Sequence, residues 1–307
     1  MTKVSIIVPN YNHAAFLKER LDSILNQTFQ DFELILLDDA STDGSVAILN
    51  TFREHPKVSH LLMNTENSGS PFRQWQRGIK LAKGTYIWIA ESDDYAHPSF
   101  LEQTVKQLDG GAHICYVQSE DVDDNGRVLS NRIDYTGEFD PNIWQEDFTM
   151  PGGEFLRKYL LVKNVIPNAS GVLFRRSLIK DSIFTQELLD MRMCGDWFFW
   201  IQLCPDHTIS FVSDTLNSFR IHAGVTRKHK DIQKKKQRIL EEVSCRNFMM
   251  KTMNVSHSEK NKVLIEHWSE LHSKWAPFSR DFYKFKPLHC GSICLFLKFL
   301  RVKLTAL

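Results

Sequence analysis

Residues 1–120 alternate short apolar segments with amphipathic ones, and this alternation restricts the fold more than any other feature of the chain. The apolar segments at 4–8, 32–37, 59–63, 86–90 and 114–118 are typical of buried strands. Between them, the apolar spacing and the end signals predict helices over 14–26, from the turn at 41–44 to about 52, over 70–82 and over 98–108. This rhythm predicts an α/β protein with a doubly wound, mostly parallel sheet.

Polar side chains follow three of these predicted strands. Glu91, Asp93 and Asp94 come directly after 86–90, Asp38 and Asp39 end the second strand, and the sequence Asn-Tyr-Asn at 10–12 follows the first. Ligands of open α/β sheets bind at the carboxyl ends of the strands. Clustered carboxylates there suit Mg²⁺ or Mn²⁺, and a tyrosine ring can stack on a nucleobase. Each of these motifs, taken alone, could also be an ordinary polar loop after a buried strand rather than part of a ligand site.

The rest of the chain has a different pattern. Residues 121–150 are polar and irregular, with a hairpin turn expected at Asn125-Gly126. Helices are expected at 153–161 and 197–203, and strands at 171–174, 208–212 and 216–221. From about residue 228 the sequence is helical in pattern and basic. We therefore expect a catalytic domain over 1–225, with halves at 1–120 and 121–225, and a basic helical extension over 226–307.

The overall charge of +1 conceals a strong asymmetry. Residues 1–219 contain 19 Lys and Arg against 30 Asp and Glu, whereas residues 220–307 contain 19 against 7. An acidic body with a basic tail suggests that the tail meets an anionic surface. The six cysteines form no CxxC pair, which favours free thiols in a reducing cytosol over a zinc site at Cys290 and Cys294. The sequence shows neither a signal-peptide layout nor an apolar run long enough for a membrane span, so a cytoplasmic location is expected.

Several segments together resemble the family 2 glycosyltransferases of the GT-A fold. They are VSIIVPNYN at 4–12, QTFQDFELILLDDASTDG at 27–44, ENSG at 66–69, GTYI at 84–87 and ESDD at 91–94. The resemblance is dense over 3–95 and thin over 165–225. It implies an inverting, metal-dependent transfer of a sugar from a nucleotide sugar, most readily a UDP-sugar, to a glycan or lipid-linked acceptor in cell-surface polysaccharide synthesis.

The resemblance also implies roles for particular residues. Nucleotide contacts fall on Pro9, Tyr11, Asn12, Asp39, Arg73 and Asp93. Ligands of a Mn²⁺ or Mg²⁺ ion fall on Glu91, Asp93, Asp94 and His222, and acceptor contacts on Ser170, Gly171 and Trp197. Asp196, in the sequence Cys-Gly-Asp-Trp, matches the family's general base. From the residues alone, a helix N-cap is the favoured interpretation of Asp196, whereas Arg73 could equally be a solvated helix residue and His222 a surface histidine.

The basic tail has two features that favour a membrane surface over nucleic acid. Residues 227–238 contain seven Lys and Arg, and residues 293–304 interleave apolar and basic side chains. A cationic amphipathic helix suits an anionic membrane, and no aromatic-basic RNA-binding motif accompanies it. We therefore expect contact with an anionic membrane surface through 228–307, peripherally on the inner face of the plasma membrane. A solvated helix packed on a core is the alternative.

Two rival functions fit the same fold. A nucleotidyltransferase that makes a nucleotide sugar would need a glycine-rich, basic phosphate loop after the first strand, and Pro-Asn-Tyr-Asn at 9–12 is not one. A catalytically inactive module that binds a nucleotide or glycan would not need Asp93, Asp94 and Asp196 together. The transferase is therefore the favoured hypothesis.

Overall fold

The computed structural model describes residues 2–222, 231–254 and 258–305. These residues divide into two units, which we describe separately. The first comprises Met1–Asp190 and Gln202–Gly224, and the second Met191–Ile201 and Val225–Leu307. The expected boundary between 225 and 226 stays a prediction.

A ten-stranded sheet forms the centre of the first unit as far as its residues are described. The strand order is β3-β2-β1-β4-β9-β6-β10-β5, with β7 beside β6 and β8 beside β10. Strands β1 to β4 run parallel, and β6 runs parallel to β10. Antiparallel β9 joins these two parallel groups. The bounds are β1 Val4–Asn10, β2 Phe32–Asp38, β3 Val58–Met63, β4 Tyr86–Ile89, β5 Tyr95–Ala96, β6 Ile114–Val122, β7 Val128–Asn131, β8 Phe148–Pro151, β9 Val172–Arg175 and β10 Thr208–Arg220.

Strands β1 and β2 are apolar along nearly their whole length because helices cover both faces of the sheet. All seven residues of each strand are buried, as is typical of parallel strands in α/β proteins. Their register sets Asn10 beside Asp38, so the polar ends of the two strands meet at one edge. The predicted α/β fold class is therefore confirmed, and so is the hairpin at 125–126, where β6 pairs with β7.

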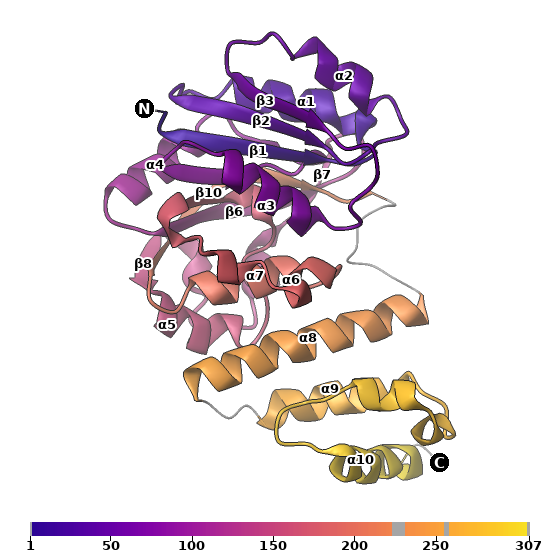
Figure 1. Ribbon diagram of the computed structural model, residues 1–307. Coiled ribbons are helices and arrows are strands. Elements are labelled where there is room, and N and C mark those ends of the chain that lie inside the picture. The colour runs from indigo at the N-terminus through magenta and orange to yellow at the C-terminus, as the bar shows by residue number, and fades with distance from the viewer. Residues whose placement is uncertain (1, 223–230, 255–257, 306–307) are drawn as a thin grey trace. The chain divides into compact units, whose positions relative to one another are not determined.

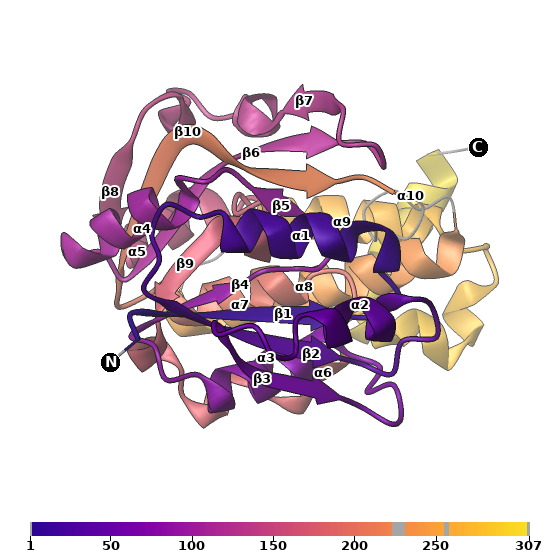
Figure 2. The same cartoon turned by 90° about the horizontal axis from the view of Figure 1, so that it is seen from above.

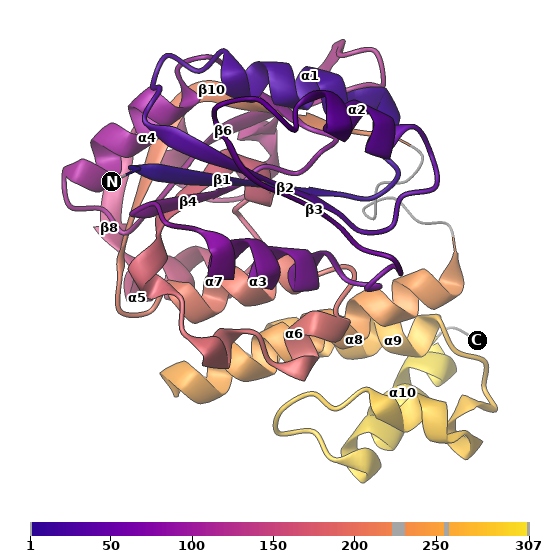
Figure 3. The same cartoon turned by 45° about the horizontal axis from the view of Figure 1, so that its top comes forward.

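The helices of the first unit lie on opposite sides of this sheet. Figure 3 shows α1 (Ala14–Leu25) and α2 (Ser45–Thr51) on one side of β1 to β3 and α3 (Pro71–Leu81) on the other. Figure 2 shows α1 running along the sheet, with α4 (Phe100–Asp109) on the same side. Leu17 and Leu21 of α1 share a core cluster with Val8 and its neighbours. On the opposite face, α3 approaches so closely that a Cβ at Gly78 would lie 2.4 Å from a methyl carbon of Ile7.

The structure corrects two expected elements. Segments 208–212 and 216–221 form one strand, β10, because register irregularities between Val212 and Asn217 absorb the polar residues between them. The expected helix at 153–161 starts as α5 (Gly152–Phe155) and continues as a π-helical turn over Leu156–Leu160. The short helix α6 (Gln186–Asp190) completes the first unit.

The second unit is helical. It contains α8 (Ile232–Met253), α9 (Ser258–Glu270), α10 (Ser292–Thr305) and most of α7 (Gly195–Leu203), which are labelled in Figure 1. Trp268 stacks on Phe285 in its core, with ring centroids 5.2 Å apart, and Phe299 of α10 joins the same cluster. In the part of the chain that the structure describes, no helix combines the length and the apolar character needed to span a membrane.

Candidate active site at the carboxyl ends of the strands

Three segments that follow β1, β4 and β10 bring one histidine, one aspartate and a second histidine together. A ring nitrogen of His13, a carboxylate oxygen of Asp93 and a ring nitrogen of His222 all lie within 4.8 Å of one another. Nε2 of His222 is 3.0 Å from Oδ2 of Asp93, and Nδ1 of His13 is 2.8 Å from the hydroxyl of Ser92. Within the described residues, no other group of three such side chains is close enough to hold a metal ion.

The charges of this cluster stabilise one another. Burial acts to raise the pKa of Asp93, but the hydrogen bond with His222 and the charges of both histidines outweigh it and lower that pKa. The same hydrogen bond raises the pKa of His222. Asp93 is thus held as a carboxylate, the form in which an aspartate binds a cation.

The other two acids of the loop are engaged by the protein. Asp94 accepts a hydrogen bond from the backbone N–H of Arg220 at 3.0 Å and another from the amide of Asn168 at 3.3 Å. Glu91 accepts one from the indole N–H of Trp75 at 2.8 Å. Burial, and then the charge of Asp93, raise the pKa of both acids. The structure therefore groups Asp93 with His13 and His222, whereas Glu91 and Asp94 accept hydrogen bonds from other protein groups.

Arg220 fixes the loop that carries Asp93. Its side chain is buried, and its guanidinium donates to the backbone oxygens of Asp93, Asp123 and Asp124 and to the carboxylate of Glu19. All three nitrogen atoms of this guanidinium thus have protein partners. A buried, fully hydrogen-bonded arginine of this kind positions backbone rather than offering free donors to a ligand.

The expected nucleotide-binding residues lie around the ends of β1 and β2. Pro9 is buried in β1, Tyr11 is 45% exposed, and Asn12 adopts a positive φ of 57°. The side-chain oxygen of Asn12 accepts from the backbone N–H of Thr42 at 2.7 Å, which ties together the loops after the two strands. Among these residues the Tyr11 ring is the exposed aromatic surface available to a base.

Asp39 and Arg73 differ from each other in accessibility. The buried carboxylate of Asp39 accepts hydrogen bonds from Asn64, Ser68 and Gln74 at 2.6 to 2.9 Å, with Ser68 donating through both its backbone N–H and its hydroxyl. Oδ1 accepts three of these four bonds and Oδ2 accepts one. Asp39 therefore organises residues 64–74 from within, whereas Arg73 is exposed on α3.

The expected acceptor residues are divided between the two units, and the expected base lies in the second. In the first unit, Ser170 and Gly171 are buried, and the Ser170 hydroxyl accepts from the backbone N–H of Glu91 at 3.1 Å. In the second unit, Asp196 lies in the first turn of α7, where it accepts from the backbone N–H of Trp197 at 2.7 Å. Trp197 is buried, with the Arg246 guanidinium 5.4 Å from its ring.

A carboxylate of α8 holds the chain just before Asp196. Glu241 accepts hydrogen bonds from the backbone N–H groups of Arg192, Met193 and Cys194 at 2.7 to 2.9 Å. These bonds lie within the second unit and fix the direction in which α7 begins.

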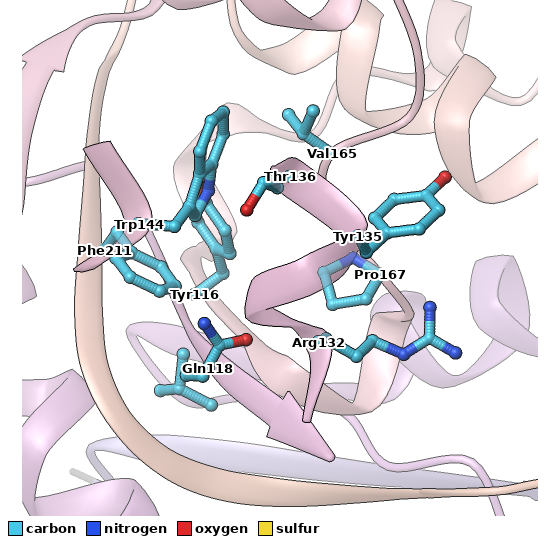
Figure 4. A pocket seen from close by; sticks show the side chains of 10 residues that line it. Tyr116, Gln118, Arg132, Tyr135, Thr136, Trp144, Val165, Pro167 and Phe211 are labelled. Atoms are coloured by element: carbon cyan, nitrogen blue, oxygen red, sulfur yellow. The ribbon is translucent and has the colours of Figure 1, made fainter. Parts of the chain in front are cut away.

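Two hollows lie beside β6, away from residues 91–94, which we call the acidic loop. Figure 4 shows the smaller, where Tyr116, Trp144 and Phe211 gather near Gln118. Its volume of about 10 Å³ leaves room for one water molecule. The larger, of about 290 Å³, is lined by Asp121, Ser130, Asn131, Arg132, Asp134 and Tyr135. Neither of these two hollows is lined by a residue of the acidic loop.

His13 is the main site residue that sequence reasoning did not identify. It directly follows the Asn-Tyr-Asn segment, and histidine is the commonest metal ligand among side chains, which was the available signal. Asn168 is another residue whose contacts the sequence does not indicate. Its amide group bonds Asp94, Asn217 and the backbone of Gly171, and no local pattern predicts these contacts.

Two curated proteins are similar to parts of this chain. Glycosyltransferase GlyG of Streptococcus pneumoniae serotype 4 is 31% identical over 192 residues, which are 60% of this chain and 58% of that protein. A poly(ribitol-phosphate) beta-glucosyltransferase of Bacillus spizizenii is 43% identical over 95 residues, which are 30% of this chain and 15% of that protein. The chain thus matches only part of the length of these relatives.

Solved structures show the same fold. The crystal structure of residues 1–349 of TarS from S. aureus in complex with UDP-GlcNAc superposes with a TM-score of 0.63 at 18% identity. The superposition covers 98% of this chain and 81% of that one, which confirms the expected GT-A type of α/β fold. The sequence model of the family described as Glycosyl transferase family 2 matches residues 5–183. Because this match spans more than half of the 307 residues, the protein belongs to glycosyl transferase family 2.

Proposed function

We propose that the protein is an inverting, metal-dependent glycosyltransferase that moves a sugar from a UDP-sugar to a hydroxyl of a glycan or lipid-linked acceptor. The observation that carries this proposal is the cluster of His13, Asp93 and His222 near the exposed ring of Tyr11, at the strand ends where α/β sheets bind ligands. The complex of the TarS fragment with UDP-GlcNAc supports a UDP-sugar as donor, and the curated names of the relatives support sugar transfer.

The donor set fits a divalent cation and favours Mn²⁺ over Mg²⁺. One carboxylate and two imidazoles can approach a common point. Imidazole suits transition metals, whereas Mg²⁺ prefers oxygen ligands and retains several waters. When bound, the ion neutralises the charge that develops on a diphosphate leaving group. Asp93 and the two histidines would hold the ion, while Arg220 and Asp94 keep the loop in place.

The proposed general base is Asp196. An inverting transfer needs a carboxylate that takes the proton of the attacking hydroxyl. The backbone N–H of Trp197 donates a hydrogen bond to Asp196, and the bonds from 192–194 to Glu241 fix the start of α7. These contacts hold the carboxylate of Asp196 at the start of α7.

A donor screen tests the proposed activity. The purified protein is incubated with UDP-glucose, UDP-galactose, UDP-N-acetylglucosamine and the GDP and dTDP analogues, each with Mn²⁺ and with EDTA, and released nucleoside diphosphate is measured. We expect release from one UDP-sugar, dependent on Mn²⁺. Release only from a GDP-sugar or dTDP-sugar would correct the donor. No release from any donor, alone or with acceptor glycans and lipid extracts, would contradict the transferase proposal.

Replacing His13 by Ala is expected to weaken Mn²⁺ binding by roughly 10- to 100-fold, the range seen when the immediate surroundings of a metal site are altered. The reason is the loss of one of the three side chains that converge on the site. Mn²⁺ titration followed by calorimetry measures this. The control is His60→Ala, which removes an imidazole from β3 at the far edge of the sheet. Equal Mn²⁺ affinity of His13→Ala and wild type would exclude His13 from the site.

We also propose that the second unit attaches the protein to an anionic membrane surface. Ile293, Leu297 and Leu304 of α10 are 77%, 59% and 69% exposed, and the partly exposed Leu300 completes their stripe along the helix. No acidic residue occurs in α10, whereas residues 298, 301 and 303 are basic. An apolar stripe flanked only by positive charge suits an interfacial helix on anionic lipid. Residues 228–230, 255–257 and 306–307 of the expected contact region lie outside the described residues.

Replacing Leu297 by Glu is expected to weaken binding to vesicles containing phosphatidylserine about tenfold or more, because one buried leucine contributes ~1.5–3 kcal/mol and the new charge is repelled. Vesicle flotation measures this, with phosphatidylcholine vesicles for comparison. Leu129→Glu is the matched control, since Leu129 of β7 is also 57% exposed but lies in the first unit. Equal binding by Leu297→Glu and Leu129→Glu would rule out the α10 stripe as the contact.

A further inference from the structure

The larger of the two hollows beside β6 lies near the edge of the sheet where ligands of α/β proteins bind. Asp121 of β6 lines it, one residue before that strand ends, and pairs with Phe219 of β10. Because β6 and β10 run parallel, their carboxyl ends reach the same edge, and His222 follows Phe219 by three residues. Strand β10 lies between β6 and β5, which directly follows the acidic loop. We call this space the hairpin hollow, because the hairpin of β6 and β7 contributes Asp121, Ser130 and Asn131 to its lining.

A buried ion pair is the most firmly held part of the lining. Arg132 is only 7% exposed, and its Nε and Nη2 atoms lie 2.6 and 2.5 Å from Oδ1 of Asp121. The guanidinium carbon also lies 5.0 Å from the ring centroid of Phe219 and 5.6 Å from that of Tyr135. Oδ2 of Asp121 accepts a longer bond, of 3.3 Å, from the hydroxyl of Ser130. A carboxylate oxygen can accept two hydrogen bonds, so Oδ2 has capacity for a ligand.

The short 3₁₀ helix that completes the lining is also held in place. It covers Arg132–Thr136 and begins where the side-chain oxygen of Asn131 accepts from the backbone N–H of Ile133 at 2.8 Å. Lys163 donates to the backbone oxygen of Tyr135 at 2.5 Å, and its Nζ lies 3.9 Å from the centroid of the Tyr135 ring. The Tyr135 side chain is 37% exposed. A tyrosine fixed in this way offers contact area to a ligand at little cost in conformational entropy.

The charges of the lining disfavour an anionic ligand. Two carboxylates, Asp121 and Asp134, and one guanidinium, Arg132, give the lining a net charge of −1. A phosphate or carboxylate group would be repelled there, because like charges placed together cost affinity. The hydroxyl groups of Ser130 and Tyr135 can both donate and accept hydrogen bonds. A neutral ligand that carries several hydroxyl groups therefore matches this lining.

The size of the hairpin hollow suits one small ligand. Its volume of about 290 Å³ is close to the lower end of the range of about 300–1,000 Å³ for ligand pockets. Arg132 and Tyr135 also line the smaller hollow, where Figure 4 shows them. Since that space admits only a water molecule, a ligand of sugar size can be held only on the side lined by Asp121, Ser130 and Asp134.

We propose that the hairpin hollow binds an uncharged sugar unit of the acceptor glycan. The inference rests on the proposed function where it calls the glycan an acceptor, and it deepens that function by naming the chemical class the hollow takes. Asp121 and Asp134 accept hydrogen bonds from the sugar hydroxyls, and the Tyr135 ring packs against the ring carbons. The six lining residues include none of those proposed to bind nucleotide or metal, so the sugar bound there is not the one that reacts.

Blocking the hollow tests the inference directly. Ser130→Trp places a large side chain in the hollow from β7. Leu129→Trp is the matched control, since neighbouring side chains of a strand point to opposite faces and Leu129, 57% exposed, does not line the hollow. Binding of methyl glycosides and disaccharides of glucose, galactose and N-acetylglucosamine, and of glucose 1-phosphate, is measured by saturation-transfer NMR in EDTA without nucleotide. We expect a neutral sugar to bind wild type, Ser130→Trp to weaken that binding at least tenfold, and Leu129→Trp to leave it unchanged.

Replacing Asp134 by Ala provides a second test that does not fill the hollow. The residue is exposed, so its removal leaves no buried charge without a partner. We expect binding of the neutral sugar to weaken roughly tenfold or more, the usual effect of losing hydrogen bonds to a charged group. Asp206→Ala changes an exposed aspartate outside the lining and should have no effect. If Ser130→Trp does not fold, the comparison of Asp134→Ala with Asp206→Ala decides.

Three results would overturn the inference. They are no binding of any neutral sugar to wild type, binding that neither Ser130→Trp nor Asp134→Ala weakens, and binding of glucose 1-phosphate alone. Titration of the same variants with UDP in Mn²⁺ keeps this inference separate from the proposed function, because Ser130→Trp should bind UDP as wild type does. Normal UDP binding with sugar binding insensitive to both variants contradicts the hollow alone. Sugar binding that Ser130→Trp abolishes, in a protein that binds no UDP, supports the hollow and contradicts the transferase.

Discussion

Replacing Asp93 by Asn is expected to reduce sugar transfer by roughly a thousandfold, the equivalent of about 4 kcal/mol of lost metal-assisted stabilisation. Asp93 contributes the carboxylate of the cluster, and its Oδ2 lies 3.0 Å from His222. Asparagine keeps the shape of the side chain but removes the negative charge, so the site loses affinity for a cation while its packing is preserved. Product formation at saturating donor and Mn²⁺ measures the effect.

Two comparisons make this result specific. Asp22→Asn changes an exposed aspartate of α1 that pairs with Lys18 and should leave transfer unchanged. Asp94→Asn alters a residue whose oxygens accept from Arg220 and Asn168, and we expect it to lower the melting temperature in EDTA more than Asp93→Asn does. An Asp93→Asn variant with wild-type turnover would remove Asp93 from the mechanism.

Replacing Asp196 by Asn is expected to lower kcat by roughly 10²- to 10⁴-fold, the usual contribution of a general base. Binding of UDP and of Mn²⁺ should be unchanged, since neither proposed site includes Asp196. The separation of turnover from binding distinguishes a base from a residue that only maintains the fold. Asp190→Asn, at an exposed aspartate of α6, is the control. Unchanged kcat in Asp196→Asn would require another base.

The helices and strands were largely predictable because their signals are local. Continuous apolar runs predicted β1 and β2, which are buried along their whole length. The four-residue spacing of Leu17 and Leu21 likewise predicted the buried face of α1. The sequence predicts two strands where the structure has the single strand β10. The polar residues that separate the two predicted strands are accommodated by a register irregularity, which the sequence does not indicate. The antiparallel insertion of β9 between β4 and β6 depends on distant segments, and no local pattern indicates it.

The location of the candidate site was predictable from the sequence, but the contacts that distinguish its carboxylates from one another were not. Glu91, Asp93 and Asp94 are chemically similar in sequence, and only tertiary contacts separate Asp93, beside two histidines, from its neighbours. Asp39 illustrates the same limit. Its position at the end of β2 predicts a nucleotide contact, but no local pattern indicates that its carboxylate also accepts from Asn64, Ser68 and Gln74.

Calorimetric titration of the wild-type protein with UDP, in Mn²⁺ and then in EDTA, tests the central claim most directly. The claim is that the carboxyl ends of β1, β4 and β10 form one site for a nucleoside diphosphate and a divalent ion. We predict that UDP binds in Mn²⁺, that EDTA abolishes this binding, and that GDP, CDP and dTDP bind more weakly. Binding of UDP that is equally strong in EDTA, or no binding of UDP in Mn²⁺, would contradict the account.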